Sequence, residues 1–303
     1  MTPEPWPALP LAEWQETKDT LQMWTQVVGK VRPALTPLVN HWWNVPLYVT
    51  ARGLTTSDMH YQGESFEVDF DFIDHQLIVR CSDGATRSLP LAPRTVADFY
   101  GEFMALLAGL GIEVKIWSTP VEVPDPIPFE QDVRHASYNP EYAHRFWRIL
   151  SRAEKVFEEF RAGFIGKVSP VHFFWGSFDL AVTRFSGRRA PEREGADRIT
   201  REAYSHEVIS HGFWPGGGPV ADAAFYAYAA PEPPGLKEAP VRPAAASYSR
   251  EASESILMYD DVRQDRAPEA ALMEFLQSTY EAGANLAQWD RAVLERAGPS
   301  PKS

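Results

Sequence analysis

The chain has a single cysteine, Cys81, among its 303 residues. One cysteine excludes an intrachain disulfide and any zinc site built from several thiolates. Basic residues are also scarce, because 29 Lys and Arg stand against 41 Asp and Glu and leave a formal net charge of −12. An acidic chain of this kind argues against nucleic acid and against an anionic membrane as partners, since both attract positively charged surfaces.

No stretch is apolar over the length that a bilayer span needs, and the chain does not begin with a basic segment followed by an apolar one. We therefore expect a cytoplasmic protein without a membrane partner. Hydrophobic residues make up 44% of the chain and aromatic residues 13%, which is enough for a substantial core. The composition does not predict the oligomeric state.

Four prolines up to Pro10 predict an extended lead-in over residues 1–13. Residues 14–118 then show the periodicities of a first α+β half. Its predicted elements are a helix from Trp14 to Val31, the strands Val45–Arg52, Ser65–Ile73, Leu77–Cys81 and Thr86–Leu91, the helix Val96–Leu110, and the strand Ile112–Trp117.

Residues 119–139 carry four prolines in the span Thr119–Asn139 and predict a linker or an ordered strap. A second α+β half, residues 140–295, follows with the same order of elements. Its predicted elements are a long helix from Pro140, the strands His172–Arg184, Ala203–Phe213, Phe225–Ala229 and Ile256–Tyr259, and a helix Pro268–Ala282 that extends toward Glu295. A long loop rich in Arg and Glu, residues 186–203, occurs in this half alone.

Short motifs recur in the two halves in the same order. Gly29-Lys30-Val31 resembles Gly166-Lys167-Val168, and His41-Trp42-Trp43 resembles His172-Phe173-Phe174. We therefore predict an α+β fold of two similar helix–antiparallel-sheet–helix halves, a pseudo-repeat, with the helices packed on one face of the sheet. Gene duplication and convergence on one topology both account for such a pattern.

Several longer stretches are distinctive. They are VNHWWNVPLYVTARGLTT, FDFIDHQL, PVHFFWGSFDLAVTRFSGRRAPEREGADRITREAYSHEVISHGFWPGG and FLQSTYEA. On these stretches the chain resembles an uncharacterised bacterial family of unknown function, and the resemblance extends over nearly the whole chain. It implies no activity, cofactor or catalytic residue, so any function must come from the residues themselves.

The parity of the second-half strands predicts a catalytic group. Side chains alternate between the two faces of a strand, which puts Asp179 on a polar face and Glu207 with His211 on one face of the next strand. We predict that these three converge at a polar and aromatic sheet face. Because crowded carboxylates need a balancing cation, Arg184, Arg188 or a bound metal should lie beside them.

The same region predicts the ligand contacts. Arg184 and Arg188 would hold a small molecule, with an anionic one favoured, through their guanidinium groups. The remaining predicted contacts are Trp175, Ser177 and Trp214. The loop 186–203 is either a lid over this site or a self-paired solvated loop.

A divalent metal is the one cofactor that the residues bring into consideration. Its candidate ligands are His172, His206, His211 and Glu207. The spacing of these histidines is not that of a zinc-protease helix, and a strand bulge would be needed to bring His206 and His211 to one side. His135 and three other histidines, by contrast, are predicted to be loop or surface residues.

Two functions remain open. The first is a small-molecule enzyme that uses Asp179, Glu207 and His211 for acid–base or metal-assisted chemistry. The second is a non-catalytic module that binds a ligand or a protein at the same surface. The reaction and the substrate are unknown from the sequence.

Overall fold

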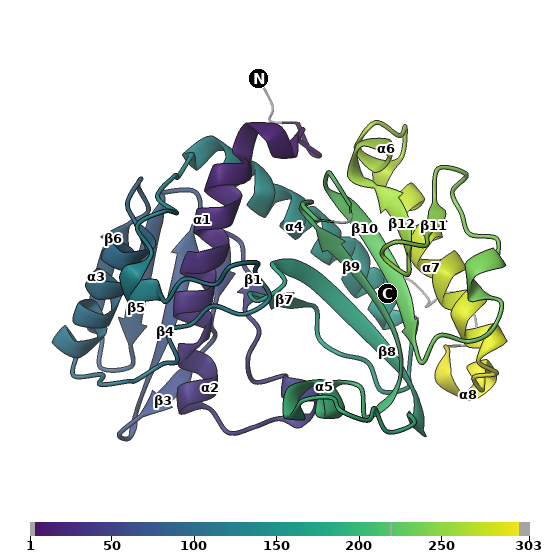
Figure 1. Cartoon of the computed structure of the whole chain (residues 1–303), viewed down its shortest axis with the longest axis horizontal. Helices are drawn as coiled ribbons and strands as arrows, with labels where there is room; N and C mark the ends of the chain where they lie inside the picture. Colours follow the sequence, from purple (N-terminus) through teal and green to yellow (C-terminus); the bar gives the residue numbers. More distant parts are fainter. Residues whose placement is uncertain (1–3, 219, 297–303) are drawn as a thin grey trace.

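A computed structural model describes residues 4–218 and 220–296. The chain forms two antiparallel β-sheets with helices packed against them, so the predicted α+β class is confirmed (Figure 1). The first sheet has the strand order β1-β2-β4-β5-β6, with β3 paired to β4. The second sheet has the order β11-β12-β10-β9-β8-β7.

The elements up to residue 139 build the first sheet and its helices. They are α1 (Leu11–Gly29), α2 (Val31–Leu35), η1 (Asn40–Trp42), β1 (Tyr48–Val49), β2 (Gly53–Thr55), β3 (Met59–Tyr61), β4 (Glu64–Asp71), β5 (Gln76–Cys81), β6 (Thr86–Pro90), α3 (Val96–Gly109) and η2 (Phe129–Gln131).

The elements from residue 140 onward build the second sheet and its helices. They are α4 (Pro140–Ala162), β7 (His172–Phe174), β8 (Asp179–Arg189), α5 (Arg198–Ala203), β9 (His206–Trp214), β10 (Ala224–Ala230), η3 (Leu236–Glu238), β11 (Ser247–Ser249), β12 (Glu254–Met258), α6 (Tyr259–Arg263), α7 (Pro268–Leu286) and α8 (Arg291–Leu294).

The helix boundaries follow from local chemistry. Thr95 precedes α3, and its hydroxyl accepts a hydrogen bond from the backbone N–H of Asp98. Asn139 caps α4 in the same way, and Pro140 occupies the first helical position, where its missing N–H costs nothing. Both helices therefore begin where the sequence predicts.

The two sheets meet edge to edge. Leu47, just before β1, and Phe173 of β7 exchange two backbone hydrogen bonds of 2.9 and 2.8 Å. Helix α1 lies between the two sheets in Figure 1 and contacts both α3 and α4. Trp14 of α1 packs on Phe146 of α4 with ring centroids 5.3 Å apart, so one hydrophobic core joins the two halves.

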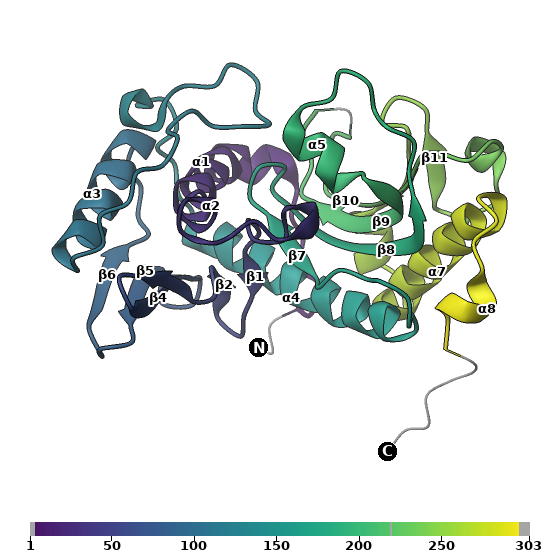
Figure 2. The ribbon, with the colours of Figure 1, turned by 90° about the horizontal axis from the view of Figure 1, so that it is seen from below.

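The second sheet has two different faces. The register pairs Val182 with His211 and Thr183 with Ser210. The helix face, which α4 and α7 cover, carries Leu180, Val182, Arg184, Ile209, His211 and Phe213. The open face carries Asp179, Ala181, Thr183, Ser210, Gly212, Tyr226 and Tyr228. Figure 2 shows α4 along one side of this sheet and α5 on the other.

Some predicted strands are wrong. The run His172–Arg184 is a hairpin, because the chain turns at residues 175–178 with Phe178 at φ 61°. Strand β8 extends to Arg189 and α5 begins at Arg198, so the predicted loop 186–203 is irregular only over residues 190–197. The segment Ile112–Trp117 is not a strand, since no described strand pairs with it.

Candidate functional site

The structure does not bring Asp179, Glu207 and His211 together. Asp179 lies on the open face of the second sheet, whereas His211 lies on the helix face. The parity argument placed each side chain correctly within its own strand. It did not give the register between β8 and β9, which sets Val182, and not Asp179, beside His211.

His211 is a core residue. Its side chain is 0% exposed, and Nε2 lies 3.1 Å from the Thr279 hydroxyl of α7. Burial, and then the nearby Arg184 charge, lowers the pKa of His211 to about 3. The imidazole is therefore neutral at physiological pH and sealed from ligands.

Glu207 and Arg188 form an ion pair at the end of the sheet. The Arg188 guanidinium donates two hydrogen bonds of 2.9 and 2.7 Å to one Glu207 carboxylate oxygen. It also donates to the carbonyls of Ala287 and Gln288, at 2.6 and 3.2 Å, just beyond α7. Arg188 thus ties the β8 extension to α7 and does not face Asp179.

Arg184 is enclosed by aromatic rings on the helix face. Its guanidinium carbon lies 3.4 Å from the Phe160 ring centroid and 4.3 Å from that of Tyr280. Burial lowers the pKa of Arg184 to about 10. Arg184 and Arg188 therefore do not lie beside Asp179, where the sequence predicts them as ligand contacts.

The proposed metal ligands are also dispersed. His172 is buried near Trp43 and Tyr48, with its pKa lowered to about 3, chiefly by burial. His206 lies beside His41, with ring centroids 5.6 Å apart. Within residues 4–218 and 220–296, no group of three or more His, Cys, Asp or Glu has the geometry to hold a metal ion. His172, His206, His211 and Glu207 accordingly do not form a ligand set.

Asp179 is the centre of a different polar group. The hydroxyls of Ser177 and Tyr226 donate to its two carboxylate oxygens. The carboxyl is 6% exposed, and burial raises its pKa despite these two donors. We call Ser177, Asp179 and Tyr226 the Asp179 cluster.

Two further carboxyls adjoin this cluster. Burial, and then the Asp179 charge, raises the pKa of Glu122 and raises that of Glu254 to about 7. An added Cβ at Gly176 would lie 2.5 Å from Glu122 Oε1, which places this carboxyl on the turn that carries Ser177. In the described part of the chain, none of the three carboxyls forms an ion pair. Such a group retains its protons to higher pH than surface carboxyls do.

A pocket of about 1120 Å³ opens beside the Asp179 cluster, and we call it the central pocket. Its walls come from one side of α1, the proline-rich segment from Pro120 to Ser137, and the Ser177 turn. Trp214, Gly217 and Gly218 close the end at β9. Gln26 of α1 fixes the proline-rich segment by exchanging hydrogen bonds of 2.8 and 2.9 Å with the Val121 backbone.

A histidine–aspartate pair lines the same pocket. His135 Nδ1 lies 2.7 Å from Asp132 Oδ2, and the Asp132 side chain is only 1% exposed.

Acidic side chains outnumber basic ones around the central pocket, and Lys18 already contacts Asp19 at 3.2 Å. The acidic lining residues are Glu16, Asp19, Glu122, Asp125 and Asp132, and the basic ones are Lys18 and Arg134.

Two of the three remaining predicted ligand contacts lie at the central pocket, and one does not. Ser177 and Trp214 line the central pocket. Trp175 does not, because its Nε1 donates to the Val45 carbonyl at 2.7 Å and its ring packs on Gly29 of α1. Trp175 therefore joins the β7–β8 turn to the first half.

Sequence reasoning missed Glu122, Asp132, His135 and Tyr226. Asp132 and His135 are three residues apart in a segment without periodicity, so their spacing was a signal that went unused. Nothing in the sequence places Glu122 beside Asp179, because 57 residues of chain separate them and only the packing of the proline-rich segment brings them together.

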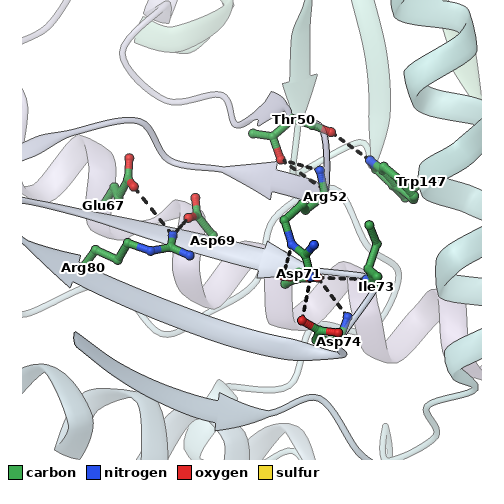
Figure 3. A network of polar contacts seen from close by, with 10 residues as sticks. Thr50, Arg52, Glu67, Asp69, Asp71, Ile73, Asp74, Arg80 and Trp147 are labelled. Carbon is green, nitrogen blue, oxygen red and sulfur yellow. Dashed lines mark hydrogen bonds and ion pairs between the residues drawn. The ribbon is translucent and has the colours of Figure 1, made fainter.

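A second polar surface lies on the first sheet, where Glu67, Asp69 and Asp71 alternate with core residues (Figure 3). Arg80 contacts Glu67 and Asp69, and Arg52 lies 2.6 Å from both Asp71 and Asp74. Each of these acids thus has a basic partner, including the buried Asp71, which distinguishes them from Glu122, Asp179 and Glu254.

Comparison with known proteins gives one match. The model of a family described as "Family of unknown function (DUF5996)" matches residues 6–296. No curated protein and no solved structure matches the chain. None of the helices formed by the described residues combines the length and the apolar character that a membrane crossing requires.

Proposed function

Since the chain belongs to the DUF5996 family, whose function is unknown, we propose its function from the geometry of the central pocket. The protein is a small-molecule enzyme that uses acid–base chemistry in this pocket. Glu122 and the Asp179 cluster act as its acidic side. The observation that carries the proposal is a set of carboxyls beside a large pocket that form no ion pair among the described residues, with Asp179 buried, Glu254 partly buried and Glu122 on the pocket wall.

Among the described residues, no basic side chain forms an ion pair with Glu122, Asp179 or Glu254. A carboxyl that is buried without an ion pair keeps its proton to higher pH, so it donates a proton at a pH where a surface carboxyl is ionised. Glu122 lines the pocket and has a raised pKa. Asp179 lies behind Ser177 and raises the proton affinity of Glu122 further.

The charge of the pocket bears on the class of ligand. Arg184 and Arg188 are engaged elsewhere, and the acidic lining residues exceed the basic ones. A small molecule that carries a positive charge therefore fits the pocket better than the anionic ligand expected from the sequence.

A binding module without catalysis is the second proposal. Both oxygens of Asp179 already accept hydrogen bonds from Ser177 and Tyr226. A carboxyl held in this way can serve to shape a ligand site without exchanging protons with the ligand.

Three four-carbon probes test the ligand class. We expect putrescine, a dication, to raise the melting temperature, and butane-1,4-diol and succinate to have no effect. Asp125→Asn should weaken putrescine binding about tenfold in calorimetry, because it removes an acidic side chain from the pocket wall. The exposed Glu113→Gln is the matched control and should bind like the wild type. Preferential binding of succinate would contradict the proposed class.

Turnover separates the two functions. The protein is incubated with a mixture of cellular metabolites, and mass spectrometry follows the concentration of each. Depletion by the wild type and by Glu113→Gln, but not by Asp179→Asn, supports the enzyme. Retention of a metabolite without its conversion supports the binding module.

We propose, too, that residues 14–118 and 140–295 are similar units, joined by the segment 119–139 and with their long helices on one face of the sheet. Each begins with a helix, continues with strands ordered β1-β2-β4-β5-β6 or β7-β8-β9-β10-β12, and ends with a helix. Aligning the two halves across family members tests this idea. Motif pairs that fail to recur in the same order would contradict it.

A cytoplasmic location, supported by the single Cys81, also remains a proposal.

A further inference from the structure

We propose that His135 is the base of the central pocket and that Asp132 is its positioning residue. The inference rests on the proposed function, because it assigns the second proton-transfer group of the same pocket. The sequence pattern alone placed His135 among loop and surface residues. The structure puts it on the pocket wall, in a 2.7 Å contact with a buried carboxylate.

Asp132 is held rigidly. Its Oδ1 accepts hydrogen bonds from the backbone N–H groups of Arg134 and His135, at 3.0 and 3.1 Å. Its backbone carbonyl accepts from Ala97 N–H, and the His135 carbonyl accepts from Val96 N–H, both at 3.0 Å. The pair is therefore anchored on the first turn of α3, which fixes the direction of the imidazole ring.

The contact with Asp132 assigns the two ring nitrogens. An ionised carboxylate only accepts hydrogen bonds, so Nδ1 carries the proton and Nε2 keeps a free lone pair. Among the described residues, Nε2 has no hydrogen-bond partner. The ring is 21% exposed and borders the pocket, so this lone pair is available to a bound molecule.

The chemistry that follows is a proton transfer. A hydroxyl or amine N–H of the ligand gives its proton to Nε2, the new N–H bond forms there, and the electron pair stays on the ligand heteroatom. Asp132 then stabilises the imidazolium through the Nδ1–H bond. Glu122, on another wall of the pocket, can give its carboxyl proton to a second basic atom of the ligand, so that one proton is taken up at Nε2 and one is released from Glu122.

A second histidine beside an aspartate, His60, shows that such a pair alone does not make a base for a bound ligand. His60 Nε2 lies 3.6 Å from Asp58, but the imidazole is 80% exposed and the aspartate is also open to solvent. His60 is not among the residues that line the central pocket. His60 thus provides a matched control for His135.

Acylation by diethyl pyrocarbonate measures the availability of the Nε2 lone pair. The reagent acylates an unprotonated imidazole nitrogen, and peptide mass spectrometry gives the rate at each histidine. We expect His135 to react at least as fast as the far more exposed His60. Asp132→Asn should slow acylation of His135 at least tenfold and leave His60 unchanged. The Asn oxygen keeps the backbone hydrogen bonds, while its NH₂ group faces Nδ1 and forces the proton onto Nε2.

Two further measurements make the result decisive. His60→Gln should leave the His135 rate unchanged. In the wild type, ¹⁵N NMR of the histidine rings should show the neutral imidazole of His135 protonated at Nδ1, and this measurement requires no substitution. A proton on Nε2, or equal acylation rates in wild type and Asp132→Asn, would overturn the inference.

Protection by putrescine separates this inference from the proposed function. If both hold, putrescine slows acylation of His135 but not of His60. A tenfold effect of Asp132→Asn without putrescine protection supports His135 as the base and overturns the cationic ligand class. Putrescine binding with no effect of Asp132→Asn supports the ligand class and overturns the role of His135.

Discussion

Single ionisable side chains in this protein behave according to their burial and partners. Burial lowers the pKa of His172 and His211 to about 3, so both are neutral core groups. Burial also raises the pKa of Asp179 and Glu254, and no ion pair within the described residues compensates them. Unpaired acids beside a pocket are costly for stability, which is the expected property of groups that serve a function.

Glu254 gives a pH-dependent prediction. Its pKa rises from 4.5 to about 7, chiefly through burial, so the folded protein binds more protons than the unfolded chain between these pH values. Stability therefore falls as pH rises through this window. Glu254→Gln should raise the free energy of unfolding by about 1–3 kcal/mol at pH 8 and by much less at pH 5. The exposed Glu251→Gln is the control in urea titrations, and a pH-independent effect of Glu254→Gln would refute the assignment.

His211 and Glu207 give a second prediction. His211→Ala should lower the free energy of unfolding by about 3 kcal/mol, because it opens a cavity against Phe160 and removes the hydrogen bond to Thr279. Glu207→Gln weakens only the partly exposed pair with Arg188 and should cost less than about 1 kcal/mol. Chemical denaturation at pH 7 measures both. A stable but functionally inactive His211→Ala protein would instead restore the sequence-based catalytic role.

Among the helices and strands, the close approach of β9 and β10 matters most for the site. Gly212 of β9 pairs with Tyr226 of β10 and with Ala181 of β8. The Tyr226 ring lies directly over Gly212, where any larger residue would have its Cβ. The small residue at this position lets the Tyr226 hydroxyl reach Asp179.

Two glycine substitutions test this arrangement. In Gly212→Ala the added Cβ would lie 2.5 Å from the Leu180 carbonyl oxygen and would collide with the Tyr226 ring. We expect a loss of about 2 kcal/mol and displacement of Tyr226 from Asp179. Gly101→Ala, in the interior of α3 with open space around it, should instead add about 0.5–1 kcal/mol through helix propensity. Thermal unfolding compares the pair, and a neutral Gly212→Ala would show that the sheet relaxes around the methyl group.

The two halves of the chain depend on each other. Gln22 of α1 donates to the Gly176 carbonyl at 2.7 Å, and Trp147 of α4 donates to the Thr50 carbonyl at 2.9 Å. The central pocket also uses both halves, since α1 and the proline-rich segment form one side and the Ser177 turn forms another. The pocket therefore exists only when the halves are joined.

Cooperative unfolding follows from this shared core. Calorimetry should show one transition with equal calorimetric and van't Hoff enthalpies. The fragments 1–118 and 119–303, produced separately, should lack the near-ultraviolet circular dichroism of packed aromatic residues, because Trp14 and Phe146 lose each other's contact. Two separate transitions, or a fragment that folds alone, would show that the halves are independent domains.

Local patterns in the sequence predict much of the secondary structure. The alternation from Phe66 to Phe72 specifies β4, and the apolar stripe after Pro140 specifies α4. Both predictions succeed because side-chain periodicity depends only on backbone geometry. Asp179 was recognised for the same reason, since it alternates with the core residues of its own strand.

Tertiary packing sets what local patterns leave open. The register of β8 against β9 separates Asp179 from His211, and the fold of the proline-rich segment brings Glu122 and His135 to the pocket. Strand register and loop packing depend on contacts between residues far apart in the chain, which periodicity does not encode. The residue types of the site were therefore visible in the sequence, while their grouping into one pocket required the folded chain.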